Sequence, residues 1–278
     1  MDLNILTNRD GFRREVIAAL AGGPLDYLEQ LAFMKHRRNT PERWEGAGVL
    51  LLLHFPDDPG DGYRFLLNKR SARVKQGGDL CAPGGGPRPF LDRLTQKLLQ
   101  TGLLPGSRGP GFRQARARGG KAYRKILFFL ATALRESWEE MGLSPFNIEF
   151  LGPLRTQRLL SRNWVIFPLV GRVKRSWRPR LSWEVERLVS IPLRTFFQPE
   201  NYALYFPELG APRLPGAGEF PCLVYDAAGR EEILWGATYR IIRSFLKTVL
   251  PLPLPSPDGG RVVRRPLVAN YFSGSRGS

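Results

Sequence analysis

Three glutamates near the middle of the chain, Glu136, Glu139 and Glu140, are spaced as i, i+3 and i+4. On a helix, this spacing stacks the three carboxylates on one face. Three anions this close repel one another and raise one another's pKa, so stability alone does not explain the cluster. Carboxylate oxygens are ligands that Mg²⁺ and Mn²⁺ prefer, and both cations also bind substrate phosphates. The pattern therefore indicates a divalent-cation site or, as the plainer alternative, a solvated helix face.

The residues around the glutamates predict the helix that carries them. Gly142 follows as a C-cap and Pro145 lies just beyond, so the helix is expected to end there. Apolar residues recur at helical spacing along the rest of the segment, which predicts a buried side opposite outward-facing acids. This context favours the cation site over the solvated face. The apolar residues are Leu127, Leu130, Ala131, Leu134, Trp138 and Met141.

Residues 135–143, R-E-S-W-E-E-M-G-L, resemble the second half of the Nudix hydrolase signature, G-x5-E-x7-R-E-U-x-E-E-x-G-U, where U is a bulky apolar residue. Ser137 departs from it at an apolar position. The first half is similar to residues 83–86, P-G-G-G, followed by Asp92 where Glu is usual. Between the halves lie the 42 residues 93–134, where the signature has seven. The chain thus resembles a Nudix box split by an insertion of about 35 residues.

This resemblance implies a fold and a chemistry. The fold is expected to be α/β, a Nudix-type α/β/α sandwich around a mixed β-sheet. The activity is expected to be metal-dependent hydrolysis of a pyrophosphate bond, with Mg²⁺ or Mn²⁺ as cofactor. By resemblance, the metal ligands are Glu136, Glu139 and Glu140, joined by the backbone carbonyl of Gly85 or Gly86.

The resemblance also implies catalytic roles. The catalytic residues are expected to be Glu139, Glu140 and Arg135, and in the family this arginine ties the helix to the acid after the glycines, here Asp92. The signature does not determine the general base. One of the three signature glutamates is a candidate, and three other acids are candidates for which an ordinary surface carboxylate is the alternative. These are Glu184, Glu186 and Glu219.

Blocks outside the signature resemble the coenzyme A pyrophosphatase branch of the Nudix proteins, although residues 72–82 lack the branch's usual His and Gln. This resemblance implies coenzyme A or acyl-coenzyme A as substrate. Coenzyme A carries a 3′-phosphate that needs an extra cation, and Lys69, Arg70 and Lys75 are the candidates. The blocks are residues 66–71, 184–193 and 233–242.

Two other functions stay open. One is a Nudix hydrolase acting on another nucleotide, such as a dinucleotide, a nucleotide sugar or a capped RNA. The other is a nucleotide-binding protein that has kept the fold without turnover, against which the intact R-E-x-x-E-E counts. The expected partner is in each case a phosphorylated small molecule, with nucleic acid possible but not favoured and the oligomeric state open.

The chain divides into a helical arm at residues 1–45, a catalytic domain at 46–250 and a Pro- and Arg-rich tail at 251–278. The tail is expected to be extended or to add a docking strand. Helices are expected near residues 12–21 and 25–33, and strands at 46–53, 63–67, 148–154, 163–171 and 184–193.

The inserted segment, about residues 93–127, begins with a possible helix at residues 91–99. A loop of this length is usually a functional lid or is disordered. It could therefore supply phosphate-binding arginines to the site, or it could be a mobile basic loop without a direct role. Its basic residues are Arg113, Arg116, Arg118, Lys121, Arg124 and Lys125.

Composition sets broader bounds. The chain has 278 residues, of which 42% are hydrophobic. Its formal net charge of +17 predicts anionic partners or, alternatively, reflects a genome rich in G and C. Its two cysteines, Cys81 and Cys222, form neither a disulfide framework nor a metal motif and are consistent with a reducing cytoplasm. The longest apolar run before the signature has strand length, so no membrane partner is expected.

Overall fold

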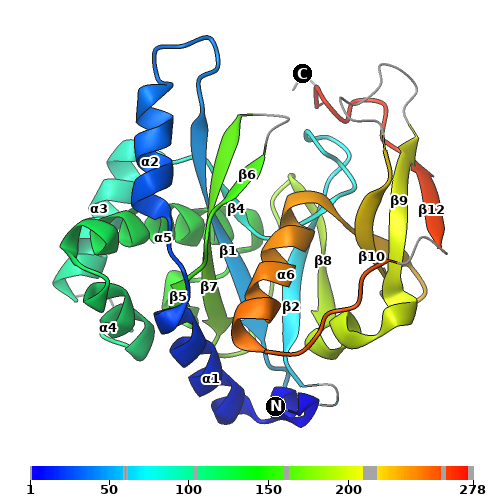
Figure 1. The fold of residues 1–278 in the computed structure, drawn as a ribbon, viewed down its shortest axis with the longest axis horizontal. Helices are drawn as coiled ribbons and strands as arrows, with labels where there is room; N and C mark the ends of the chain where they lie inside the picture. Colours follow the sequence, from blue (N-terminus) through cyan, green and yellow to red (C-terminus); the bar gives the residue numbers. More distant parts are fainter. Residues whose placement is uncertain are drawn as a thin grey trace.

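The computed structural model describes residues 2–58, 60, 62–102, 106–159, 163–208, 218–257 and 261–274. Within them, the chain forms a sheet of eight strands and a second sheet of four strands (Figure 1). The helices are α1 (Arg9–Gly22), α2 (Tyr27–His36), α3 (Pro89–Thr101), α4 (Pro110–Ala117), α5 (Gly120–Met141) and α6 (Gly236–Val249). The strands of the first sheet are β1 (Glu45–His54), β2 (Arg64–Arg70), β3 (Leu80–Cys81), β4 (Gly84–Gly85), β5 (Ile148–Pro153), β6 (Gln157–Leu159), β7 (Trp164–Val173) and β8 (Val185–Pro192). Those of the second sheet are β9 (Tyr202–Glu208), β10 (Phe220–Asp226), β11 (Glu231–Leu234) and β12 (Val262–Pro266).

Strand β1 lies at the centre of the large sheet. It runs parallel to β7 and antiparallel to β2, which confirms the predicted hairpin. Because successive side chains alternate between faces, Leu50 and Leu52 enter one hydrophobic core while Leu51 and Leu53 enter the other. Both faces of the strand are therefore covered, which explains why its sequence is an unbroken apolar run.

Helices cover both faces of this sheet. Phe12 of α1 and Phe245 of α6 belong to one core, and Tyr27 of α2 and Leu127 of α5 belong to the other. The strand pairs are both parallel and antiparallel. The predicted fold class, an α/β/α sandwich around a mixed sheet, is thus confirmed.

The N-terminal residues are more closely integrated than an arm would be. Phe12 and Tyr27 are both 0% exposed, and the Tyr27 hydroxyl donates to the Pro168 carbonyl at 2.6 Å. Removing the first 45 residues would open both cores. We therefore propose that residues 1–45 fold together with residues 46–250.

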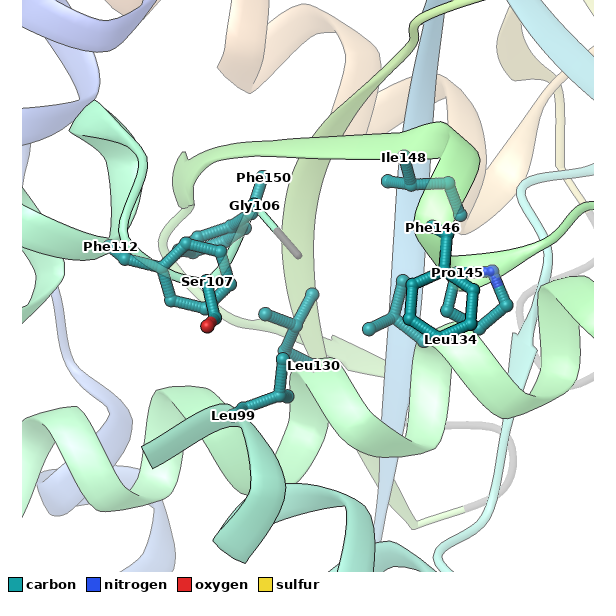
Figure 2. Close-up of a pocket in the computed structure, with 10 residues that line it drawn as sticks. All are labelled: Leu99, Gly106, Ser107, Phe112, Leu130, Leu134, Pro145, Phe146, Ile148 and Phe150. Atoms are coloured by element: carbon teal, nitrogen blue, oxygen red, sulfur yellow. The ribbon is translucent and has the colours of Figure 1, made fainter. Parts of the chain in front are cut away.

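The inserted segment is helical: the possible helix at residues 91–99 is confirmed as part of α3, and the expectation of a long loop is wrong for the other described residues. It forms α3, α4 and the first turns of α5, and α4 packs on β5 through Phe112 and Phe150, whose rings lie 5.1 Å apart. Figure 2 shows these two rings beside Leu130 of α5, with Leu134 next to Phe146 on the other side of an apolar cavity. The cavity has a volume of about 20 Å³. Little space is left unfilled where the segment meets the sandwich. Residues 103–105 lie outside the described residues.

The second sheet was not predicted. Its strand order is β11-β10-β9-β12, and β12 adds parallel to β9, so the C-terminal tail contributes a docking strand. Strands β9 and β10 lie on either side of residues 209–217, which are outside the described residues.

Helix α5 ends as expected, with Gly142 in the left-handed conformation at φ 66°. Ser137, the departure from the signature, is buried and its hydroxyl donates to the Ala133 carbonyl at 2.7 Å, so the helix satisfies it internally. Trp138 was expected on the buried side and is 46% exposed, with the Arg180 guanidinium 5.5 Å from its ring. In the described part of the chain, no helix is both long and apolar enough to span a bilayer.

Candidate active site

The three signature glutamates share one side of α5 but differ in burial. Glu140 is 6% exposed, whereas the side chains of Glu136 and Glu139 are 17% and 35% exposed. The expectation that all three acids face outward is therefore wrong for Glu140. Solvent exposure on this face therefore increases from Glu140, which is buried against the sheet, through Glu136 to Glu139.

Arg135 connects the two separated halves of the signature. Its Nε donates to Asp92 Oδ1 at 2.9 Å, and its Nη1 donates to Glu136 at 2.8 Å and to Glu139 at 3.0 Å. Its Nη2 donates to the Gly86 carbonyl at 3.0 Å. The predicted contact between Arg135 and Asp92 is confirmed, so the inserted residues leave the ends of the two halves in contact.

Asp92 is itself fixed from three directions. It is 0% exposed, and it accepts hydrogen bonds from the Thr132 hydroxyl at 2.8 Å and from the Arg88 backbone N–H at 2.7 Å. Burial lowers the pKa of the Arg135 guanidinium, but its bonds to Asp92 and the charge of Glu136 outweigh this and raise the pKa. Arg135 therefore stays charged beside the acids.

A glycine turn runs directly beside the acids. Strand β4 pairs with β1 at Gly84 and Gly85, and a Cβ placed on Gly85 would lie 2.6 Å from a Glu136 carboxylate oxygen. Any side chain at this position would displace Glu136, so only glycine allows the backbone to approach the carboxylate.

Glu140 has a strongly perturbed pKa. Burial and then the charge of Glu136 raise the pKa of Glu140 to about 8, against the opposing charge of Arg70. Asn68 Nδ2 donates to its Oε2 at 2.7 Å, while the Asn68 Oδ1 atom is buried without a partner. Burial also raises the pKa of Glu136, despite its contact with Arg135. Two close carboxylates with raised pKa values are the electrostatic setting that a cation relieves.

Carboxylate and carbonyl oxygens are the ligands that a hard divalent cation prefers, but in this structure the side chains do not point to one common position. Within the described ranges, no group of three or more His, Cys, Asp or Glu side chains is arranged to hold a metal ion. The reason is local: Glu139 is held by Arg88 at 2.7 Å and by Arg135, and the Gly86 carbonyl accepts from Arg135. Glu136 and Glu140 repel each other electrostatically, since the charge of Glu136 contributes to raising the pKa of Glu140.

Of the predicted substrate cations, the structure brings Arg70 to the acids and directs Lys69 away. The Arg70 guanidinium is largely buried, which lowers its pKa, but Cys81, Glu140 and Glu184 outweigh this and raise it. Lys69 occupies the other face of β2, where its Nζ lies 2.7 Å from Glu232. The alternation of strand side chains explains this split between adjacent residues.

Lys75 is exposed in the loop after β2, and its backbone carbonyl accepts from Arg70 Nε at 2.9 Å. Among the outside candidates for general base, Glu184 lies near Glu140, because its charge contributes to raising the pKa of Glu140. Glu186 is exposed and 3.9 Å from Arg187. Glu219 is exposed just before β10, in the second sheet.

The arginines of the insertion make other contacts. Arg113 donates to the Arg108 carbonyl at 3.1 Å, and the Arg116 guanidinium lies 5.3 Å from the Tyr123 ring. Arg118 Nη2 donates to the carbonyls of Leu20, Ala21 and Gly23 at 2.6, 2.9 and 2.8 Å, which caps the end of α1. These three arginines therefore contact backbone carbonyls and an aromatic ring, and the contacts do not support the expectation that they bind substrate phosphates.

Two site residues escaped the sequence analysis. Asn68 precedes Arg70 by two positions on β2, so strand alternation alone would have placed both on one face. Arg88, which pairs with Glu139, lies in the spacer before Asp92, and no sequence signal distinguishes it from other surface arginines.

No protein-family model matches the chain, and no curated protein matches it. Solved structures do align with it. A MutT/nudix family protein from Enterococcus faecalis is 14% identical with a TM-score of 0.40, over 80% of this chain and 69% of the other. A NUDIX hydrolase from Alicyclobacillus acidocaldarius is 14% identical with a TM-score of 0.37, over 54% and 80%. The NUDIX domain of Shewanella oneidensis NrtR, complexed with ADP ribose, is 16% identical with a TM-score of 0.32, over 60% and 83%.

Proposed function

We propose that this chain is a Nudix-type pyrophosphohydrolase that acts on a nucleoside diphosphate linked to a second moiety. The observation that carries the proposal is the set of hydrogen bonds from Arg135 to Asp92, Glu136, Glu139 and the Gly86 carbonyl. One arginine joined to three carboxylates leaves an excess of negative charge beside a glycine turn. That excess suits a divalent cation and, through it, a diphosphate.

The residues that would hold Mg²⁺ or Mn²⁺ are Glu136 and Glu140, with Glu139 and the Gly86 carbonyl. Such a cation would neutralise phosphate oxygens during in-line attack by water. Glu140 must be deprotonated to serve as a ligand, and its pKa of about 8 in the cation-free site makes binding pH-dependent. Arg135 keeps the carboxylates oriented and limits their repulsion.

For the general base we favour Glu184. It is half-buried, it acts on Glu140 electrostatically, and its backbone carbonyl accepts from the Ser71 N–H at 2.8 Å, which anchors it next to the loop after β2. Its carboxylate would accept the proton of the attacking water. Glu186 and Glu219 are surface carboxylates in this proposal.

Coenzyme A or an acyl derivative is the proposed substrate. Arg70 and Glu184 come from two of the blocks that resemble the coenzyme A branch, and both act on Glu140. Trp235 of the third block donates to Asp79 at 3.1 Å, in the loop that follows Arg70. The three blocks thus meet around one loop, where Arg70 and Lys75 would bind phosphate. Lys69 drops out of this role because Glu232 already pairs with it.

The test is a panel of nucleotide diphosphates incubated with Mg²⁺ or Mn²⁺, with products identified by mass spectrometry. Coenzyme A should yield 3′,5′-ADP and 4′-phosphopantetheine, and dephospho-coenzyme A should be a poorer substrate. EDTA should abolish turnover. Cleavage of ADP-ribose or a dinucleotide without cleavage of coenzyme A would overturn the substrate but keep the reaction. Turnover of no diphosphate under any metal condition would overturn the reaction itself.

A further inference from the structure

The C-terminal residues 267–274, here called the strap, lie across the loop between β2 and β3, residues 71–79. The Tyr271 hydroxyl donates to Asp79 Oδ2 at 2.6 Å, and the Tyr271 carbonyl accepts from the Gln76 N–H at 2.7 Å. Asn270 Nδ2 donates to the Ala72 carbonyl at 2.9 Å. The strap is therefore bonded to the beginning, middle and end of a loop almost 200 residues earlier in the chain.

The same loop holds Arg70 at three points. The Arg70 N–H donates to the Asp79 carbonyl and the Arg70 carbonyl accepts from the Gly78 N–H, each at 2.9 Å. Arg70 Nε donates to the Lys75 carbonyl, also at 2.9 Å. Displacing the loop would consequently displace the guanidinium that faces Glu140.

The loop is not in a conformation that its own residues favour. Gln76 has φ 58°, in the left-handed region that is unfavourable for a residue other than glycine. Its N–H is the one that donates to Tyr271. The strap thus bonds to the strained residue of the loop.

Asp79 provides the second anchor. Burial raises its pKa to about 6, while its hydrogen bonds from Tyr271 and Trp235 act in the opposite direction. A buried carboxylate needs such donors, because an unsatisfied one is costly. Tyr271, which supplies one of them, is only 4% exposed and therefore well fixed.

We propose that the strap is a positioning element for substrate: through Tyr271 and Asn270 it sets the loop that carries Lys75 and orients Arg70 toward the acids. This inference rests on the proposed function, since it assigns the two cations to substrate phosphates. It predicts that the far C-terminus governs substrate affinity although it lies outside the signature.

The experiment compares Tyr271→Phe and Asn270→Ala with wild type in the full chain. Tyr202→Phe is the matched control, because Tyr202 is also 4% exposed and its hydroxyl donates to the Phe196 carbonyl at 2.7 Å. For Tyr271→Phe, KM on the best diphosphate substrate should rise roughly tenfold with kcat within about twofold. The Gln76 and Gly78 amides should exchange hydrogen faster, and 3′,5′-ADP should bind roughly tenfold more weakly.

The outcomes separate the two proposals. Faster amide hydrogen exchange in Tyr271→Phe, with unchanged KM and unchanged affinity for 3′,5′-ADP, would mean that the strap has only a structural role and would overturn the inference. An inactive wild type whose ADP binding still depends on Tyr271 would overturn the reaction and support the strap. No turnover and no ADP binding would overturn both. If Tyr271→Phe does not fold, the same measurements are made on Asn270→Ala. The hydrogen bond from the Asn270 side chain to the Ala72 carbonyl lies at the surface, so this variant is expected to fold.

Discussion

Lys69 and Arg70 are adjacent on β2, yet they belong to opposite faces of the sheet and to different kinds of site. Lys69 forms an ion pair with Glu232, which also binds Arg187, and Glu232 is 2% exposed. Arg70 is instead held by the Lys75 carbonyl and lies 3.9 Å from the Cys81 thiol, with Glu140 and Glu184 acting on it from further away.

The two faces differ in how far each charged side chain is neutralised by its partners. On the Lys69 face, Lys69 and Arg187 both pair with the buried Glu232, and Arg187 also lies 3.9 Å from Glu186, so two cations face two carboxylates. This group holds the second sheet against the first. On the Arg70 face, Glu136 shares Arg135 with Asp92 and Glu139, Glu140 accepts a hydrogen bond from the uncharged Asn68 side chain, and the pKa values of both glutamates are raised. Removing one member of a balanced buried charge cluster destabilises a fold, whereas an incompletely neutralised cluster marks a candidate ligand site.

The largest effect should separate the two buried glutamates. Replacing Glu140 by Gln keeps the hydrogen bond from Asn68 but removes a charge from the cation site, so turnover should fall roughly a thousandfold or more. The matched variant Glu232→Gln, on the other face, should keep kcat per folded molecule and lose stability. Steady-state kinetics and thermal unfolding of both variants measure this contrast. Near wild-type turnover in Glu140→Gln would show that Glu140 is not a ligand.

The pH dependence of stability provides a second readout for this pair of variants. The folded-state pKa of Glu140 is raised from 4.5 to about 8, so the folded chain binds this proton more tightly than the unfolded chain. Stability from this group is full below about pH 4.5 and is lost as the pH rises towards 8. In EDTA, the Tm of wild type should therefore fall between these values relative to Glu140→Gln.

Sequence reasoning predicted the elements with strong local signals. The apolar run of β1, the hairpin to β2 and the C-cap of α5 at Gly142 follow from residue types a few positions apart. The contact between Arg135 and Asp92 was predicted from the signature despite the intervening 42 residues, 93 to 134.

What sequence reasoning missed depends on tertiary context. In the insertion, the possible helix at residues 91–99 corresponds to α3, but α4 spans only Pro110–Ala117, and the packing of Phe112 on Phe150 could not be predicted from so short a segment. Trp138 follows the apolar spacing of α5 but is 46% exposed, and the Arg180 guanidinium lies 5.5 Å from its ring. Lys69 could have been placed by strand alternation, but its partner Glu232 is 163 residues away.

A smaller effect should separate the two neighbouring cations of β2. Arg70→Met should raise the KM of the substrate by roughly ten- to a hundredfold, since a charged hydrogen bond to phosphate is lost. Lys69→Met should leave KM within about twofold but cost roughly 3 kcal/mol of stability, because Glu232 keeps an incompletely paired buried charge. Initial rates and denaturant unfolding give both quantities. A large rise of KM in Lys69→Met with unchanged stability would restore Lys69 as a substrate ligand.

The smallest effect concerns the insertion, whose positive charge contrasts with the acidic face at the other end of α5. Arg118 bonds three carbonyls at the end of α1, whereas Arg113 is exposed and bonds one. Arg118→Met should cost about 1–2 kcal/mol and lower Tm by a few degrees, and Arg113→Met should change Tm little. Neutralising Arg113, Arg116 and Arg118 together should leave KM unchanged at low and at high salt, since these contacts hold the helices together rather than face the acids. A KM that rises severalfold at low salt only would instead mean that their positive charge draws substrate phosphates towards the site.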